Sequence, residues 1–193
     1  MTCIVAIGNG ENVWMGGDGV RHNDNDQTSR LTEPKIFIRD YGHDKILIGA
    51  SGSHLMQQLL QREWGPPPEM FDDRLARDVM WEVRKDLWEF LHQEKHRSVI
   101  CDQTTNQIQG VIIVGFRGQV WSIDSDGALC EYKVNYHAVG AGDEYALGSL
   151  HTSDDFAFLR NERGGEMRRI ESALKAASFH LSSIQGPYTY LEC

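Results

Sequence analysis

Apolar and polar positions come in short blocks at the start of the chain. Two apolar runs, residues 2–8 and 12–18, are separated by residues 9–11, which read Asn-Gly-Glu. An Asn-Gly pair between apolar runs is the strongest short-range signal of a β-hairpin, so we predict that the two runs are paired strands. A polar stretch then leads to a second predicted strand pair at residues 35–38 and 45–48. The first quarter of the chain is therefore expected to form a sheet.

The pattern changes to helical spacing from Ser53 onward. Leu55, Leu59 and Leu60 share one helical face, and Gly65 followed by three prolines cannot continue a helix. A second helix is predicted from residue 72 to about residue 95. Its apolar positions recur every four residues, at Leu75, Val79, Val83, Leu87 and Leu91.

The middle of the chain returns to strands and the last third to helices. We predict strands at residues 111–114, 120–123 and 136–139, followed by helices at residues 144–152 and 166–183. Strands and helices thus occur in blocks rather than in strict alternation. This order is typical of a mostly antiparallel sheet in an α+β fold.

Length and charge limit the classes of protein that the chain can represent. We expect a single domain over residues 1–193, because this length fits one hydrophobic core. The formal net charge of −9 disfavours binding to nucleic acid, whose phosphates would be repelled. No apolar segment approaches the length of a membrane span, so we expect a soluble, cytoplasmic protein that does not bind membranes.

Cysteines and histidines give no sign of a metal or cofactor site. The four cysteines are far apart and form no C-x-x-C pair, which is typical of reduced thiols in a cytoplasmic protein. Among the eight histidines, His92 and His96 have the i, i+4 spacing of a helical metal pair. They lack a carboxylate partner in a matching motif, so we interpret them as a solvated helix end. Residues 24–26, Asp-Asn-Asp, lack the rest of a calcium loop and are expected to form an exposed loop. We expect no metal and no cofactor.

Thr2 is the strongest candidate for chemistry. If Met1 is removed, Thr2 carries a hydroxyl and a free amine on one residue, which supplies both a nucleophile and the base that takes its proton. An α-amine has a pKa of about 7.7–8.0, so a useful fraction is unprotonated near neutral pH. A small second residue such as Thr normally permits removal of the initiator methionine, and we expect this step to free Thr2.

Three further residues can support this chemistry. Lys35 is the candidate cation that keeps the amine unprotonated, and Asp18 is the candidate partner of Lys35. Gly49 follows an apolar strand and can present its backbone N–H to an oxyanion. Each also has a simpler interpretation: Asp18 as a turn residue, Lys35 as a surface charge and Gly49 as a glycine needed for packing.

Taken together, these segments resemble the proteasome β-subunit family, and within it the bacterial HslV type. The register of the apolar strands, the Gly-Gly-Asp turn and the first lysine agrees with that family with little insertion. Later segments also fall where the family has comparable ones. The similarity lies in residues 2–7, 13–19, 35–36, 44–49, 139–146 and 188–192.

The resemblance implies a fold and a set of roles. The fold is the four-layer αββα sandwich of the N-terminal-nucleophile hydrolases, in which two mostly antiparallel sheets pack face to face between helices. The roles are Thr2 as nucleophile and base, Asp18 and Lys35 as the charge pair that tunes it, and Gly49 as an oxyanion donor.

The resemblance also implies a substrate pocket and an assembly. Leu47 and Ser51 are expected to line the pocket for the substrate residue before the cut, where a leucine favours apolar side chains of moderate size. Members of this family form rings or double rings, act on unfolded polypeptides or peptides, and in the HslV type work with a ring ATPase.

The chain departs from the family at two places. Ala141 stands where the family has a serine that helps to hold the N-terminal amine. Residues 179–182, Phe-His-Leu-Ser, replace a C-terminal region that carries an aspartate and a serine, and Ser182 is a possible substitute. Losing one charge-assisted hydrogen bond costs about 1.5–3 kcal/mol, which would slow catalysis rather than abolish it.

These observations lead to one main hypothesis and two alternatives. The main hypothesis is a cytoplasmic, ring-forming threonine endopeptidase that uses Thr2, with activity that is weak because of Ala141. The first alternative is a weak or inactive assembly or interaction subunit of the same fold. The second is a hydrolase of the same fold that acts on a small amide.

Overall fold

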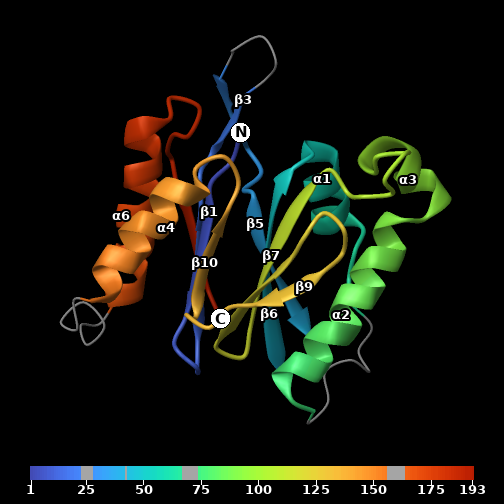
Figure 1. Cartoon of the computed structure of the whole chain (residues 1–193), viewed down its shortest axis with the longest axis horizontal. Coiled ribbons are helices and arrows are strands. Elements are labelled where there is room, and N and C mark those ends of the chain that lie inside the picture. Colours follow the sequence, from blue (N-terminus) through green and yellow to red (C-terminus); the bar gives the residue numbers. More distant parts are fainter. Residues whose placement is uncertain (23–27, 42, 67–73, 156–163) are drawn as a thin grey trace.

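Two antiparallel sheets and a short hairpin contain the strands of the described chain (Figure 1). The computed structural model describes residues 1–22, 28–41, 43–66, 74–155 and 164–193. The hairpin consists of β3 (Val20–His22) and β4 (Thr28–Arg30). The Asp-Asn-Asp segment expected to form a loop, residues 24–26, lies outside the described residues.

The first sheet brings the two ends of the chain together. Its strand order is β10-β1-β2-β11, with every neighbouring pair antiparallel. The predicted hairpin between the first two strands is confirmed, and Asn9 Oδ1 accepts hydrogen bonds from the N–H groups of Glu11 and Asn12 at 2.9 and 2.8 Å. The strands are β1 (Ile4–Gly8), β2 (Val13–Gly17), β10 (Tyr136–Val139) and β11 (Thr189–Glu192).

The second sheet runs in sequence order, β5-β6-β7-β8-β9, and is also antiparallel throughout. Its central strands are long and apolar, as expected of strands that are buried on both faces. The strands are β5 (Ile36–Tyr41), β6 (Asp44–Gly52), β7 (Gly110–Phe116), β8 (Gln119–Ile123) and β9 (Leu129–Glu131).

The helices of the described residues fall in two groups along the chain. The first group follows β6 and comprises α1 (His54–Arg62), α2 (Ala76–Leu91) and α3 (Glu94–Ile100). The second group follows β10 and comprises α4 (Asp143–Asp154) and α6 (Gly165–His180). Ser53 caps α1, since its side chain accepts a hydrogen bond from the N–H of Met56 at 3.3 Å.

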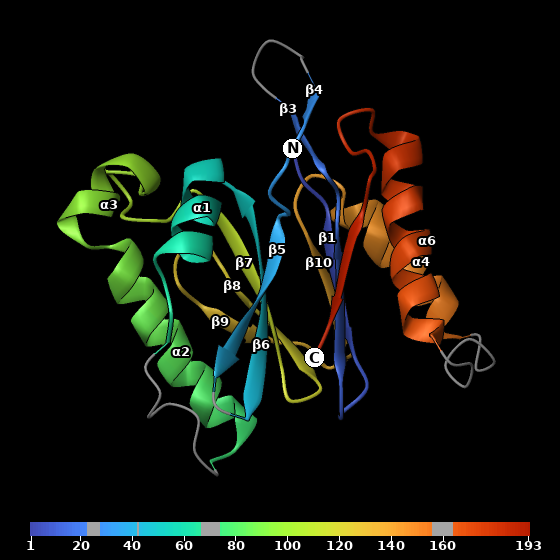
Figure 2. The ribbon, with the colours of Figure 1, turned by 180° about the vertical axis from the view of Figure 1, so that it is seen from behind.

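The two sheets face each other and the helices cover their outer faces (Figures 1 and 2). Alternation along β1 explains why its sequence is apolar throughout. Ile4 and Ala6 point into a cluster between the sheets, whereas Val5 and Ile7 point into a cluster with α4 and α6. A third cluster joins α1, α2 and α3 to the outer face of the second sheet. The predicted α+β class with mostly antiparallel sheets is confirmed.

Two parts of the predicted pattern differ from the structure. The helix predicted over residues 72–95 ends at Leu91, and α3 begins only at Glu94, because the backbone of Gln93 is extended (φ −56°, ψ 143°). The short strands β3, β4 and β9 were not predicted, since three-residue strands carry too few positions to show alternation.

The interpretation of His92 and His96 as a solvated helix end is wrong for His96. Its side chain is buried, at 3% exposed, and its Nδ1 lies 2.9 Å from the carbonyl oxygen of Phe90. His92 lies between the two helices, where its Nδ1 is 2.8 Å from the carbonyl oxygen of Trp88. Both rings thus satisfy backbone carbonyls where α2 ends, which is a structural role.

Candidate active site

Thr2 lies two residues before the start of β1, beside the turn between β10 and α4. Its carbonyl oxygen accepts a hydrogen bond from the N–H of Gly142 at 3.4 Å. Gly140 in the same turn has a φ of +104°, and a Cβ added there would stand 2.3 Å from the Thr2 carbonyl oxygen. Thr2 is 9% exposed. The glycines of this turn therefore allow its backbone to approach Thr2 closely and to fix its position.

Asp18 and Lys35 form a buried ion pair beside this segment. Asp18 follows β2 and Lys35 precedes β5, so the pair joins the two sheets. Lys35 Nζ donates to Asp18 Oδ1 and Oδ2 at 2.9 and 2.8 Å, and the residues are 3% and 1% exposed. The carboxylate also accepts hydrogen bonds from the N–H groups of Cys3 at 2.8 Å and Val20 at 3.4 Å. The same carboxylate thus holds Lys35 and the start of β1.

Lys35 also contacts the residue that precedes Thr2. Its Nζ donates to the carbonyl oxygen of Met1 at 3.1 Å. That carbonyl belongs to the peptide bond between Met1 and Thr2, so the ammonium lies beside the bond whose cleavage frees the Thr2 amine. The side chain of Met1 is also contacted: the Oγ of Ser183 donates to its sulfur at 3.2 Å.

Burial dominates the ionisation of these groups. It raises the pKa of Asp18 and lowers the pKa of Lys35, while their mutual attraction acts in the opposite direction on each. Burial also lowers the pKa of the Met1 α-amine, with Lys35 as the next largest cause and Asp18 opposing both. An amine at this end of the chain is therefore unprotonated over more of the neutral range than an ordinary α-amine.

A cavity of about 150 Å³ opens next to Thr2. Besides Met1, Thr2 and Lys35, its walls include Arg21, Gly52 and His54. The Thr2 residue, the Lys35 ammonium and a concave space thus lie together at this end of the sheets. A hydroxyl beside a cation and a cavity is the kind of grouping from which a candidate site is built.

The structure does not bring Gly49 into this group. Gly49 lies in the middle of β6, paired with Ile36 of β5 and Ile113 of β7. A Cβ added at Gly49 would meet the side chains of Ile4, Ile36 and Ile113 at 3.0–3.1 Å. The missing side chain is therefore explained by close packing between the sheets, which is the simpler interpretation considered above.

Leu47 and Ser51 also lie away from the cavity walls. Leu47 is fully buried in the cluster between the sheets, and Ser51 donates its hydroxyl to the carbonyl oxygen of Val111 at 3.4 Å. Both alternate with residues that face the helices, so their side chains point into the space between the sheets. The expectation that Leu47 sets an apolar pocket is not supported by this placement.

Gly52 is the glycine that sequence reasoning missed. It ends β6, has a φ of +98° and lines the cavity beside Thr2. The signal that could have identified it is its position between the end of an apolar strand and the cap of α1 at Ser53, where a chain leaves the sheet. Gly49 and Gly52 are three residues apart, and either could be the glycine beside Thr2. Only the fold shows that it is Gly52.

The two departures from the family pattern have different positions. Ala141 is exposed in the turn that holds Thr2. Ser182 is exposed, whereas its neighbour Ser183 is 3% exposed and contacts Met1. Ser183, not Ser182, is therefore the serine of the C-terminal region that lies beside the start of the chain.

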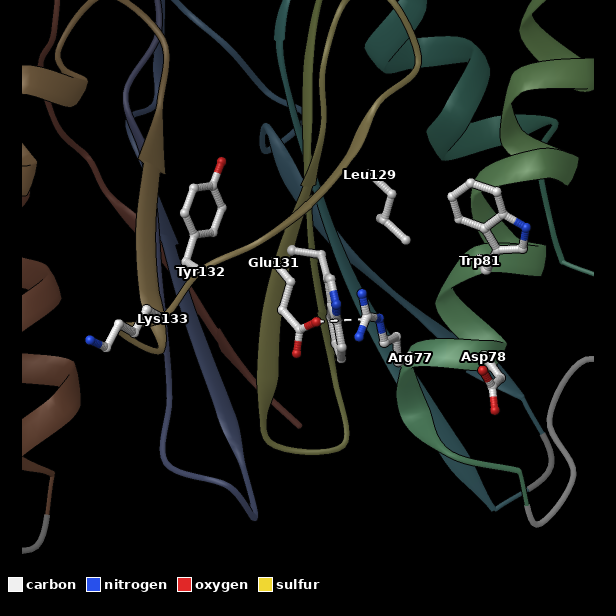
Figure 3. Close-up of a pocket in the computed structure, with 8 residues that line it drawn as sticks. Arg77, Asp78, Trp81, Leu129, Glu131, Tyr132 and Lys133 are labelled. Carbon is white, nitrogen blue, oxygen red and sulfur yellow. Dashed lines mark ion pairs between the residues drawn. The ribbon is translucent and has the colours of Figure 1, made fainter.

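A larger cavity, of about 760 Å³, lies between α2 and the edge strand β9 (Figure 3). Arg77 of α2 and Glu131 of β9 point toward each other there, with 3.6 Å between Nε and Oε2. The buried indole Nε1 of Trp121 has no hydrogen-bond partner in the described part of the chain. None of the described residues that line this cavity is a serine, threonine or cysteine, so its size alone does not make it the candidate active site.

The described residues contain no group of three or more His, Cys, Asp or Glu side chains that could hold a metal ion. They also contain no helix that is long and apolar enough to cross a lipid bilayer.

Solved structures of similar fold match nearly the whole chain, although no family model matches the sequence. The Thiobacillus denitrificans protein BPH, in complex with epoxomicin, is 14% identical with a TM-score of 0.74, covering 100% of this chain and 98% of that chain. HslV from Trypanosoma brucei is 15% identical with a TM-score of 0.69, covering 99% and 98%. Anbu from Pseudomonas aeruginosa, described as a helical assembly, is 14% identical with a TM-score of 0.67, covering 100% and 81%. The chain has the proteasome-like fold of these proteins.

Proposed function

We propose that this protein is a threonine endopeptidase of the N-terminal-nucleophile type, which hydrolyses peptide bonds of unfolded polypeptides through Thr2. The observation that carries the proposal is the contact of Lys35 Nζ, itself paired with buried Asp18, with the carbonyl of the Met1–Thr2 peptide bond at 3.1 Å. The fold shared with HslV, and with a protein that binds epoxomicin, supports it. We further propose the four-layer αββα description of this fold, a cytoplasmic location, assembly of identical copies into a ring or double ring, and work with a ring ATPase.

The proposed reaction begins once Met1 is removed. The amine of Thr2 accepts the proton of its own Oγ as Oγ attacks the carbonyl carbon of the scissile bond. The carbonyl oxygen becomes an oxyanion, and when the C–N bond breaks the Thr2 ammonium gives its proton to the leaving amine. An ester on Thr2 remains, and a water molecule that gives a proton to the same amine hydrolyses it.

Lys35 and Gly52 have supporting roles in this scheme. The ammonium of Lys35 disfavours protonation of the nearby amine, and Asp18 fixes the ammonium in place. We assign the oxyanion donor to the backbone N–H of Gly52 instead of Gly49, because Gly52 lines the cavity beside Thr2.

Covalent labelling tests the proposal directly. Protein whose first residue is shown by intact mass to be Thr2 is incubated with a peptide epoxyketone, the inhibitor class of epoxomicin. We expect a single adduct, mapped by peptide mass to Thr2. Labelling should be lost in Thr2→Ala and retained in Thr152→Ala, a matched change at an exposed threonine of α4. Failure of the Met-free protein to form the adduct would overturn the proposal.

A non-catalytic assembly subunit of the same fold is the second candidate. Ala141 favours it, and so do the contacts of Lys35 and Ser183 that hold Met1 in place. This candidate predicts that Met1 is retained in protein purified from its own host. It also predicts that Thr2→Ala leaves the biological activity unchanged.

A further inference from the structure

The cavity beside Thr2 is lined by basic and neutral side chains. Arg21, Lys35 and His54 contribute basic groups, whereas Leu31 and Gln57 are neutral. None of the described residues that line it is an aspartate or a glutamate. This composition contrasts with the chain as a whole, whose formal net charge is −9.

Among the described residues, Lys35 of the cavity has a carboxylate partner and Arg21 has none. Asp18 balances Lys35 at 2.8 Å. Glu33 is paired with Arg62. Arg21 forms no ion pair with any part of the chain that the structure describes. No carboxylate of the described residues therefore competes for its guanidinium.

Arg21 also lies close to the start of the chain. It precedes His22 in β3, which stands beside the N-terminus in both views (Figures 1 and 2). After burial and Lys35, it is a further cause that lowers the pKa of the Met1 α-amine. A side chain bound at Arg21 would thus lie next to the amine and hydroxyl of Thr2.

We propose that this cavity binds the carboxylate of a glutamate or aspartate at the substrate residue whose carbonyl Thr2 attacks. The inference rests on the proposed peptidase function and names the substrate class for it. Arg21 donates two parallel hydrogen bonds to the carboxylate, a geometry that guanidinium groups favour, and His54 is a second basic side chain in the lining. Met1 lines the cavity, so its removal enlarges the space for this side chain. The predicted preference is the reverse of the apolar one expected from Leu47.

A peptide series tests this preference. Fluorogenic peptides that differ only in the residue before the cut, namely Glu, Gln, Leu or Lys, are compared on Met-free protein. A charge-assisted hydrogen bond contributes enough for about a tenfold or larger difference, so kcat/KM for Glu should exceed that for Gln by this factor. Arg21→Gln should remove most of the difference, and Arg21→Glu should make Lys the preferred residue.

A matched control and the labelling assay separate this inference from the proposed function. Arg30 is exposed on β4, opposite Val20, and does not line the cavity, so Arg30→Gln should keep the preference for Glu. If Thr2 is labelled by the epoxyketone but Gln or Leu peptides are cleaved as well as Glu peptides, the specificity inference fails and the peptidase proposal stands. If there is neither an adduct nor cleavage of any peptide, both fail.

Discussion

At the scale of single residues, the proposed chemistry depends on the positive charge of Lys35 beside the Thr2 amine. Removal of Met1 places the Thr2 amine where the Met1–Thr2 amide nitrogen now lies, one bond from the carbonyl that contacts Lys35. Burial and Lys35 both lower the pKa of the Met1 α-amine, and we expect the same two causes to act on the Thr2 amine. Because the protonated amine cannot accept the Oγ proton, activity should rise with pH through the amine pKa.

This argument gives a pH prediction. The midpoint of the rise in kcat/KM should lie below the ordinary α-amine range of about 7.7–8.0. Lys35→Gln should move the midpoint to higher pH, because it removes a positive charge that opposes protonation. Lys45→Gln, at an exposed lysine of β6, is the control and should leave the midpoint unchanged. A Lys35→Gln midpoint equal to or below that of the parent protein would contradict the proposed role of Lys35.

The positions of individual site residues differ in how far the sequence predicts them. Asp18 directly follows the strand that pairs with β1, so its position near Thr2 follows from the hairpin register. Lys35 is brought there by the packing of the second sheet on the first, which the resemblance supplied and periodicity could not. The sequence does not show whether Gly49 or Gly52 lies beside Thr2. The fold does, because Gly52, at the end of β6, lines the cavity. The catalytic roles of Thr2, Asp18 and Lys35 stay predictions.

At the scale of elements, the turn between β10 and α4 controls the position of Thr2. Gly140 has a left-handed backbone, and any Cβ there would clash with the Thr2 carbonyl. Gly140→Ala should therefore lower the free energy of unfolding by about 1–3 kcal/mol and slow labelling of Thr2. Urea denaturation and the epoxyketone assay measure the two effects.

Gly148 provides a matched control in the helix that follows this turn. It lies within α4 and has open space around its α-carbon, so Gly148→Ala should be neutral or should stabilise the protein by about 0.4–1 kcal/mol. Labelling of Thr2 should not change. Equal effects of the two substitutions would show that the Gly140 turn does not constrain Thr2.

Elements that span many apolar positions were predictable, and those defined by tertiary contacts were not. The hairpin of β1 and β2, the strand β6 and the helix α6 each show a clear period or turn signal. The break between α2 and α3 instead depends on the rings of His92 and His96 bonding to backbone carbonyls. Such contacts override helix propensity and leave no periodic trace in the sequence.

At the scale of the whole molecule, the two ends of the chain stabilise each other. The C-terminal strand β11 pairs with β2, with Thr189 opposite Gly17. The backbones of Val13 and Cys193 exchange two hydrogen bonds at 2.7 and 3.0 Å, and Gly19 N–H donates to the carbonyl oxygen of Gln185 at 3.2 Å. The C-terminal segment thus supports both sides of Asp18, the residue that holds Lys35 beside Thr2.

Deletion of residues 189–193 should therefore affect stability and the site together. It removes the hydrogen-bond ladder along one edge of β2 and exposes that edge to water, so the urea midpoint should fall and labelling of Thr2 should slow. Glu192→Ala, which changes only an exposed side chain of the same strand, should alter neither measurement. If the deletion lowers stability while Thr2 is labelled at the parent rate, Asp18 and Lys35 are held in place without the C-terminal strand, and the dependence of the site on both chain ends is wrong.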